Sequence, residues 1–184
     1  FGPKVQFVAH GARNSDGTLS LDELTVKTKA MNLKGQAVLD SNFWPILLDI
    51  EGEVSNPSGE AVLLPSFGEP IQINYANLDV DYNTSSGDEL KAQINIQDFS
   101  ASNAKVKYLV LNLDGLMQAN ADTVQKLNAG LTLKAIDFFP SNQNVAKALG
   151  STIQGKADIN YISGEPLQLT NINLSSANWN LEGK

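Results

Sequence analysis

Apolar residues recur mostly at every second position along this chain, in runs separated by Gly, Pro, Asn, Asp and Ser. A period of two with such breaks is typical of β-strands joined by turns. The intervening positions are rich in Lys, Gln, Asn, Asp and Thr, as in "KAQINIQ", so each strand has one apolar and one polar face. The pattern predicts an all-β fold built on an elongated, mainly antiparallel sheet.

The alternation slips by one residue at three places, which are residues 21–24, 75–78 and 169–172. A β-bulge produces such a slip while it keeps the apolar side chains on one face of a bending strand. We therefore expect three bulges and a curved sheet.

One helix is predicted, at residues 141–150 with the sequence "SNQNVAKALG". Ser141 or Asn142 can cap its start, and Gly150 can end it. At most one short helix is therefore expected in the chain.

Two nearly identical strings, "GEPIQI" at 68–73 and "GEPLQL" at 164–169, place a Gly-Pro turn before the start of a strand. The segment 17–36 also aligns without gaps to 165–184, with Leu, Asn and Gly identities. We interpret residues 1–184 as a single segment with internal strand-hairpin repeats at about 17–36, 68–82 and 164–184. Unrelated hairpins that converge on the same letters are the alternative.

The amino-acid composition of the chain excludes several classes of function. Hydrophobic residues make up 42% of the chain and the net charge is −7, with dispersed basic residues, so the chain has no basic footprint for nucleic acid. With no cysteine, thiol chemistry, thiolate metal sites and disulfides are excluded. No apolar run approaches the roughly 20 residues that span a bilayer. The chain begins at Phe1 without a leader, so we expect a piece excised from a larger chain.

Candidate chemistry is sparse. His10 is the only histidine and has no local nucleophile signature, so we interpret it as structural or solvated. The stretch starting at Asp79 resembles a calcium loop, but it has Thr84 where Gly is needed and Leu90 where Glu is needed. Trp44 is expected to pack at an element end. No catalytic or metal constellation emerges, so we predict a protein without enzymatic activity and without cofactors.

Several strings, taken in order, resemble the inner region of the TamB family, in its alphaproteobacterial type. They are "GTLSLDELTVKTKAMNLKGQAVLD", "WPILLDIEGEVSNPSGEAVLLP", "VKYLVLNLDGLM" and "NAGLTLKAIDFFPSNQNVAKALGSTIQGKADINYISGEPLQLTNINLSSANWNL". The likeness extends from about residue 5 to the C-terminus. TamB is the periplasmic subunit of the translocation and assembly module of Gram-negative bacteria and belongs to the AsmA-like repeating β-groove superfamily.

The resemblance implies a β-taco, a curved sheet folded around an apolar groove that carries phospholipid between inner and outer membranes. It also implies support of outer-membrane protein assembly, including autotransporter secretion. The full-length chain would be anchored in the inner membrane, with the outer-membrane barrel TamA as partner through regions outside this fragment. The alternating residues that we expect to line such a groove are Leu19, Leu21, Leu33, Ile71, Ile73, Ile94, Ile96, Val106, Tyr108, Leu131, Leu133, Ile159, Leu167 and Leu169.

Phospholipid acyl chains are the ligand that this hypothesis predicts, because burial of each methylene gains roughly 0.8 kcal/mol. Two alternatives remain open at this point. One is a chaperone-like scaffold whose sheet edges bind unfolded outer-membrane strands. The other is a carbohydrate-binding β-repeat domain with Trp44 or Trp179 as its platform. Without a resemblance, alternating apolar residues would indicate a closed sandwich.

Overall fold

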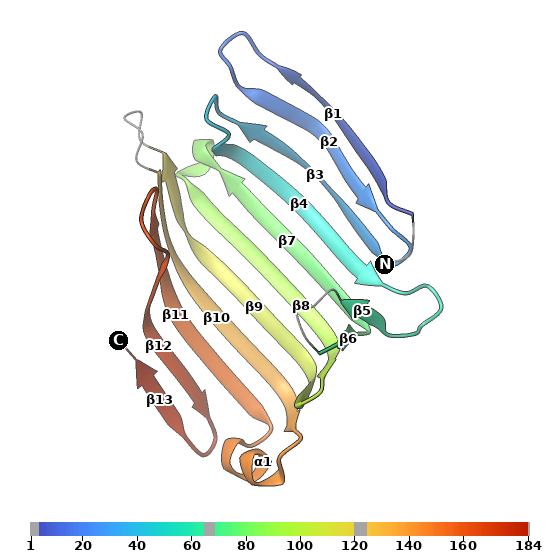
Figure 1. Cartoon of the computed structure of the whole chain (residues 1–184). Coiled ribbons are helices and arrows are strands. Elements are labelled where there is room, and N and C mark those ends of the chain that lie inside the picture. Colours follow the sequence, from blue (N-terminus) through green and yellow to red (C-terminus); the bar gives the residue numbers. More distant parts are fainter. Residues whose placement is uncertain (1–3, 65–68, 120–124, 184) are drawn as a thin grey trace.

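The computed structural model describes residues 4–64, 69–119 and 125–183 and confirms the all-β prediction. Figure 1 shows one extended antiparallel sheet with one short α-helix. A 3-10 helix, η1 (Thr84–Ser86), lies in one of the turns between strands. The strands are β1 (Gln6–Arg13), β2 (Leu19–Lys27), β3 (Met31–Leu39), β4 (Pro45–Ser55), β5 (Val62–Leu64), β6 (Ile71–Ile73), β7 (Tyr75–Asn83), β8 (Glu89–Ala101), β9 (Ala104–Ala119), β10 (Gln125–Pro140), β11 (Thr152–Ile162), β12 (Gln168–Ser176) and β13 (Asn180–Gly183), and the helix is α1 (Gln143–Leu149).

The main path of the sheet follows the chain order, except that β5 and β6 are left out between β4 and β7. The strands β5 and β6 form a small hairpin that joins the sheet through one bridge, Gln72 to Ser100. Most strands are connected by short turns, which is the arrangement that antiparallel neighbours allow. The sheet is open, and no second sheet faces it within the described ranges, so a closed sandwich is not formed.

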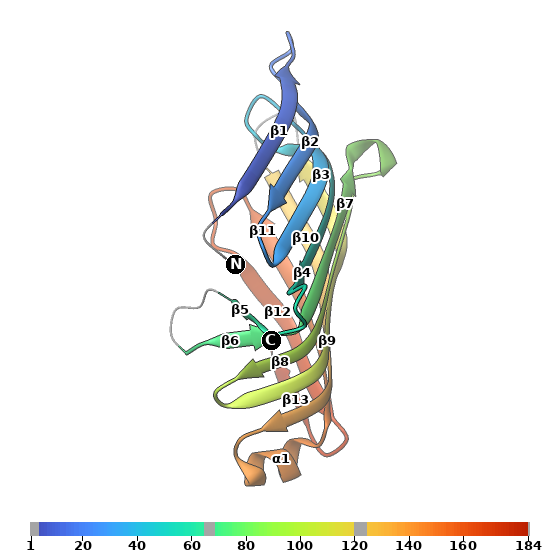
Figure 2. The ribbon, with the colours of Figure 1, turned by 90° about the vertical axis from the view of Figure 1, so that its right-hand side faces the viewer.

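The sheet is curved, and the β5–β6 hairpin lies on its concave side (Figure 2). Two clusters of buried side chains sit near opposite ends of the central strands. At one end, Val62 and Ile73 of the hairpin pack with Val54, Ala76 and Ile96 of the sheet. These contacts identify the concave face as the apolar one. The other cluster surrounds Tyr82 and includes Leu90 and Met117.

The helix α1 forms where the sequence predicts it. Asn142 is its N-cap, and its side-chain oxygen accepts hydrogen bonds from the backbone N–H groups of Asn144 and Val145 at 2.9 and 3.3 Å. The chain leaves the helix at Gly150, which has a φ of 73°. None of the helical residues is buried, so the hydrogen bonds at its caps stabilise α1 more than side-chain packing does.

Two of the three predicted bulges are confirmed. The register shifts between Leu21 and Leu24 of β2, and between β11 and β12 beside Asn171, whose φ is 51°. The third prediction is wrong, because Tyr75 and its successors pair with β4 in an unbroken register. A sharp turn at Asn74 separates β6 from β7, and Tyr75 thereby falls on the polar face.

The terminal parts of the sheet share one register. In β2 and β3, Leu24 is opposite Gly35; in β12 and β13, the aligned residues Ile172 and Gly183 are opposite each other. The same alignment, extended toward the N-terminus without a gap, matches β1 to β11. The pairing of β1 with β2 and of β2 with β3 is therefore repeated between β11 and β12 and between β12 and β13. The interpretation of 68–82 as a hairpin is wrong, because β6 and β7 each pair with β8 and not with one another. Gly68 lies outside the described residues.

Candidate functional site

The concave face of the sheet is the candidate site, because a row of apolar positions crosses every strand of the main path. Residues directly opposite each other in neighbouring strands share a face, so the register defines rows that run across the sheet. We call the longest of them the apolar row. Its members are Phe7, Val26, Leu33, Gly52, Leu78, Ile94, Leu111, Leu133, Gly155, Leu174 and Leu181.

Further rows on the same face are apolar as well. One of them links Leu24, Gly35, Ile50, Val80 and Ala92, and it continues through Leu113 and Leu131 to Ala157. No buried polar or charged side chain occurs in the part of the chain that the structure describes. The concave face is therefore apolar over several parallel rows.

Most of this face is not covered by protein. The side chains of the apolar row in the central strands are half-buried by their neighbours in the same sheet. Exposure rises at both edges, where Phe7 is 64% and Leu181 is 55% exposed. An apolar surface that the described chain leaves uncovered is costly in water, which makes the concave face the candidate site.

Glycines on the concave face let neighbouring strands approach closely. A Cβ on Gly35 would lie 2.2 Å from the carbonyl oxygen of Asp49, and one on Gly115 would lie 2.2 Å from that of Asn128. Such distances leave no room for a side chain on the concave side. Glycine at these positions is consistent with a sheet that bends toward its apolar face.

The opposite face carries a matching polar row, which we define as Thr25, Lys34, Glu51, Asp79, Gln93, Asn112, Thr132, Lys156, Asn173 and Glu182. Its side chains bind one another: the Gln93 amide donates to Asn112 at 2.8 Å, and Asn112 donates to Thr132 at 3.3 Å. These hydrogen bonds lie between exposed side chains, so this face remains hydrated.

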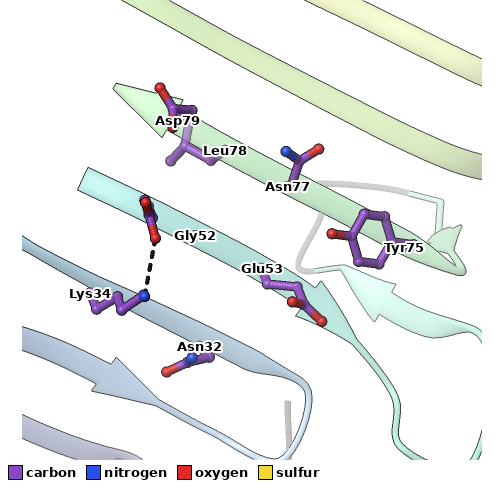
Figure 3. A pocket seen from close by; sticks show the side chains of 9 residues that line it. Asn32, Lys34, Gly52, Glu53, Tyr75, Asn77, Leu78 and Asp79 are labelled. Carbon is purple, nitrogen blue, oxygen red and sulfur yellow. Dashed lines mark ion pairs between the residues drawn. The ribbon is translucent and has the colours of Figure 1, made fainter. Parts of the chain in front are cut away.

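A shallow polar depression on this face lies over β3, β4 and β7 (Figure 3). It contains the ion pair between Lys34 and Glu51, whose charged atoms are 3.1 Å apart and well exposed to solvent. Nearby, the pKa of Lys91 is raised by its hydrogen bond to Glu89 and by the negative charges of Glu89, Asp114 and Asp81. These groups are solvated ion pairs, and none is placed as a nucleophile beside a base.

Tyr82 anchors the end of the apolar face far from the hairpin. Its side chain is fully buried, and its hydroxyl donates a 2.6 Å hydrogen bond to the carbonyl oxygen of Met117. Burial, and secondarily the negative charge of Asp88, raises the pKa of Tyr82 above its ordinary value of 10.0. Trp44 packs against the same cluster, as the sequence led us to expect.

Most of the predicted groove-lining residues share the concave face, although their contact with lipid stays a prediction. The register places there Leu19, Leu21, Leu33, Ile94, Ile96, Leu131, Leu133, Ile159 and Leu169. The hairpin strand β6 holds Ile71 and Ile73, and the latter is buried against the sheet. Val106 is buried near the start of β9, and Leu167 is exposed just before β12.

Tyr108 is the exception among these residues. It lies opposite Gln97 and Ile136, on the polar face, and is 42% exposed. The apolar positions of β9 that the prediction missed are Leu109, Leu111 and Leu113. Asn112 and Asp114 are polar and share the face of Tyr108. These two residues are the sequence signal that separates Tyr108 from the leucines of the concave face.

The histidine and the calcium-loop-like stretch that the sequence singles out do not form a catalytic or metal site among the described residues. His10 is exposed on the polar face, with its Nδ1 2.8 Å from a carboxylate oxygen of Glu23. Asp79 and Asp81 lie on the strand β7 and not in a cation-binding loop. Within the described ranges, no three His, Cys, Asp or Glu side chains gather in a way that suits a metal ion. The described helix is also too short to cross a membrane.

Comparisons with known proteins give no match: no family model, no curated protein and no solved structure corresponds to this chain.

Proposed function

We propose that the concave face carries phospholipid acyl chains, as one segment of a periplasm-spanning protein that moves phospholipid between the inner and outer membranes. In this proposal the sheet is one stretch of a β-taco whose apolar interior is open along one side. The observation that supports it best is the apolar row, which continues without interruption from β1 to β13.

The dimensions of the face suit a conduit better than a closed binding pocket. Neighbouring strands lie about 4.8 Å apart, so the main path of strands extends the apolar row over roughly 48 Å. One leaflet of a bilayer provides about 15 Å of hydrocarbon, half of its roughly 30 Å core. The row is therefore longer than one acyl chain, and a chain bound on it has further apolar surface in both directions.

The energetics also favour movement without local chemistry. Each methylene that leaves a bilayer for this face exchanges one apolar environment for another, so the roughly 0.8 kcal/mol per methylene lost on one side is regained on the other. Because the rows repeat strand after strand, a displaced chain meets an equivalent surface at each step. A carrier of this kind needs no catalytic residue.

Lipid binding is tested by native mass spectrometry of the purified chain, followed by uptake of a fluorescent acyl-chain phospholipid. We expect co-purifying phospholipid in the wild type. Ile94→Asp puts a charge on the apolar row and should reduce uptake strongly, whereas Gln93→Asp changes the adjacent residue on the polar face and should leave it intact. Equal uptake by both variants would contradict the proposal.

The free edges of the sheet favour a second candidate, a scaffold that binds unfolded outer-membrane strands. The outer side of β1, which has eight residues, is unpaired within the described chain. Such an edge can add a strand through backbone hydrogen bonds. Binding of a strand peptide that is undisturbed by phospholipid, and is lost when Ala9→Pro removes a donor from the outer edge of β1, would favour this function over lipid transport.

A further inference from the structure

The polar depression over β3, β4 and β7 lies on the face of the sheet opposite the proposed lipid surface (Figure 3). Its volume of about 420 Å³ is within the range of small-molecule pockets. Two rows of polar side chains line it, and each row crosses all three strands. They are Asn32, Glu53 and Asn77 in one row and Lys34, Glu51 and Asp79 in the other.

The polar depression offers both donors and acceptors to a ligand. The side chains of Asn32, Asn77 and Asp79 form no hydrogen bond with a described residue. An amide donates and accepts, whereas a carboxylate only accepts. Directly opposite residues of neighbouring strands have Cβ atoms about 5 Å apart, so one small ring contacts two strands at once. A sugar hydroxyl also donates and accepts, so it suits this mixture of groups.

The carboxylates of the depression favour a ligand that donates hydrogen bonds. Glu51 and Asp79 are directly opposite each other, and like charges in that position destabilise a sheet. Lys34 pairs with Glu51 at 3.1 Å, whereas Asp79 has no cationic partner among the described residues. The lining holds one lysine and three carboxylates, so its charge is negative. Hydroxyl donors would reduce the repulsion between these carboxylates, and an anionic ligand would increase it.

Tyr75 adds an aromatic surface at one end of the depression (Figure 3). Tyr75, Asn77 and Asp79 are alternate residues of β7, so they share the polar face. The C–H groups on the face of a pyranose ring are apolar and pack on an aromatic ring, while the hydroxyls at the rim reach polar side chains. Neither Trp44 nor Trp179 lines the depression. Tyr75 is therefore its aromatic platform.

The rows of amides continue beyond the depression onto β8 and β9. Asn95 is opposite Asn77, Gln93 is opposite Asp79, and Asn112 is opposite Gln93. A ligand longer than one sugar ring meets these further amides as it extends across the strands. The arrangement favours an oligosaccharide over a single sugar.

We propose that the polar depression binds a neutral oligosaccharide, with one pyranose ring stacked on Tyr75 and its hydroxyls hydrogen-bonded to Asn77 and Asp79. The inference goes beyond the proposed function and is independent of it, because the saccharide and the acyl chains occupy opposite faces of the sheet. Within the described ranges no side chains gather in a way that suits a metal ion, so sugar hydroxyls are the partners that we assign to the carboxylates.

The test titrates the purified chain with cellotetraose, cellobiose and the anionic tetragalacturonate, and NMR shifts of backbone amides report where each one binds. Tyr75→Leu removes the ring, and Tyr75→Phe keeps it. Tyr108→Leu is the matched control, because Tyr75 and Tyr108 flank Gln97 in one row of the polar face, but Tyr108 lies outside the depression. Asp79→Ala changes an exposed side chain and tests the hydroxyl contacts without altering the ring. Phospholipid uptake by every variant is measured in parallel.

We expect cellotetraose to bind about tenfold more tightly than cellobiose or tetragalacturonate, with shifts in β3, β4 and β7. Tyr75→Leu should weaken binding about tenfold and Asp79→Ala several-fold, whereas Tyr75→Phe and Tyr108→Leu should change it little. Phospholipid uptake should be the same in all four variants. Absence of cellotetraose binding, equal losses in Tyr75→Leu and Tyr108→Leu, or tighter binding of tetragalacturonate would overturn the inference and leave the proposed function in place. Saccharide binding by a chain that takes up no phospholipid would support the inference while the proposed function fails.

Discussion

The close approach of two strands at Gly115 allows a sharp test of the curved sheet. In Gly115→Ala the new Cβ would lie 2.2 Å from the carbonyl oxygen of Asn128, 2.4 Å from the Cα of Ala129 and 2.5 Å from its Cβ. These contacts are mostly with backbone, which cannot move without disturbing the pairing of β9 and β10. Overpacking typically costs about 1–3 kcal/mol and more against rigid surroundings, so we expect a loss of about 3 kcal/mol.

Gly130 is the matched control, because it lies on the neighbouring strand but faces the polar side. A Cβ there would find its nearest atom, the carbonyl oxygen of Asp114, 3.8 Å away. Gly130→Ala should therefore change stability little, or raise it by about 0.4–1 kcal/mol through the lower entropy of the unfolded chain.

Urea unfolding followed by tryptophan fluorescence measures both variants. With an m-value of about 2 kcal/mol/M, Gly115→Ala should lower the midpoint by about 1.5 M, while Gly130→Ala should shift it by less than about 0.5 M upward. Equal midpoints for the two variants would refute the close approach at Gly115, and with it the argument that glycines permit the bend toward the apolar face.

Three further predictions concern the ends of the sheet. Tyr82→Phe should lose about 1–1.5 kcal/mol of stability, since it removes the hydrogen bond to Met117. The raised pKa of Tyr82 means that the unfolded chain releases this proton first, so wild-type stability should fall above about pH 10, and chemical denaturation should show a smaller fall in the variant. Ile73→Ala should cost about 2–5 kcal/mol and speed proteolysis of the β5–β6 hairpin; unchanged cleavage would contradict its anchoring role. Asn142→Ala should weaken only α1, by about 1 kcal/mol, which amide hydrogen exchange will detect as lost protection there and nowhere in the sheet.

Local physics explains which parts of the fold could be predicted from the sequence. Alternation of apolar and polar residues is a property of each strand, so the strands and their apolar faces could be inferred one at a time. The cap at Asn142 and the stop at Gly150 are likewise local, and the helix forms where they indicate.

The errors arise where both faces of a strand are locally apolar or where the chain turns sharply. In "VKYLVLNL" apolar residues occupy both odd and even positions of 106–111. The face of Tyr108 could therefore be assigned only from the polar residues that follow this stretch. At Asn74 the chain turns between β6 and β7, and the continuous alternation from Ile71 through Tyr75 concealed the break. The placement of the β5–β6 hairpin on the concave face depends on distant contacts with Val54 and Ile96, which no local pattern carries.

The most direct test of the central claim places a photoreactive amino acid on each face at the same level of the sheet. Ile94 and Leu111 are opposite each other on the concave face, and Gln93 and Asn112 are opposite each other on the polar face. Irradiation in lipid-containing membranes followed by mass spectrometry should give phospholipid adducts at Ile94 and Leu111 and almost none at Gln93 and Asn112. Adducts at equal yield on both faces, or at none of the four positions, would contradict lipid carriage on the concave face.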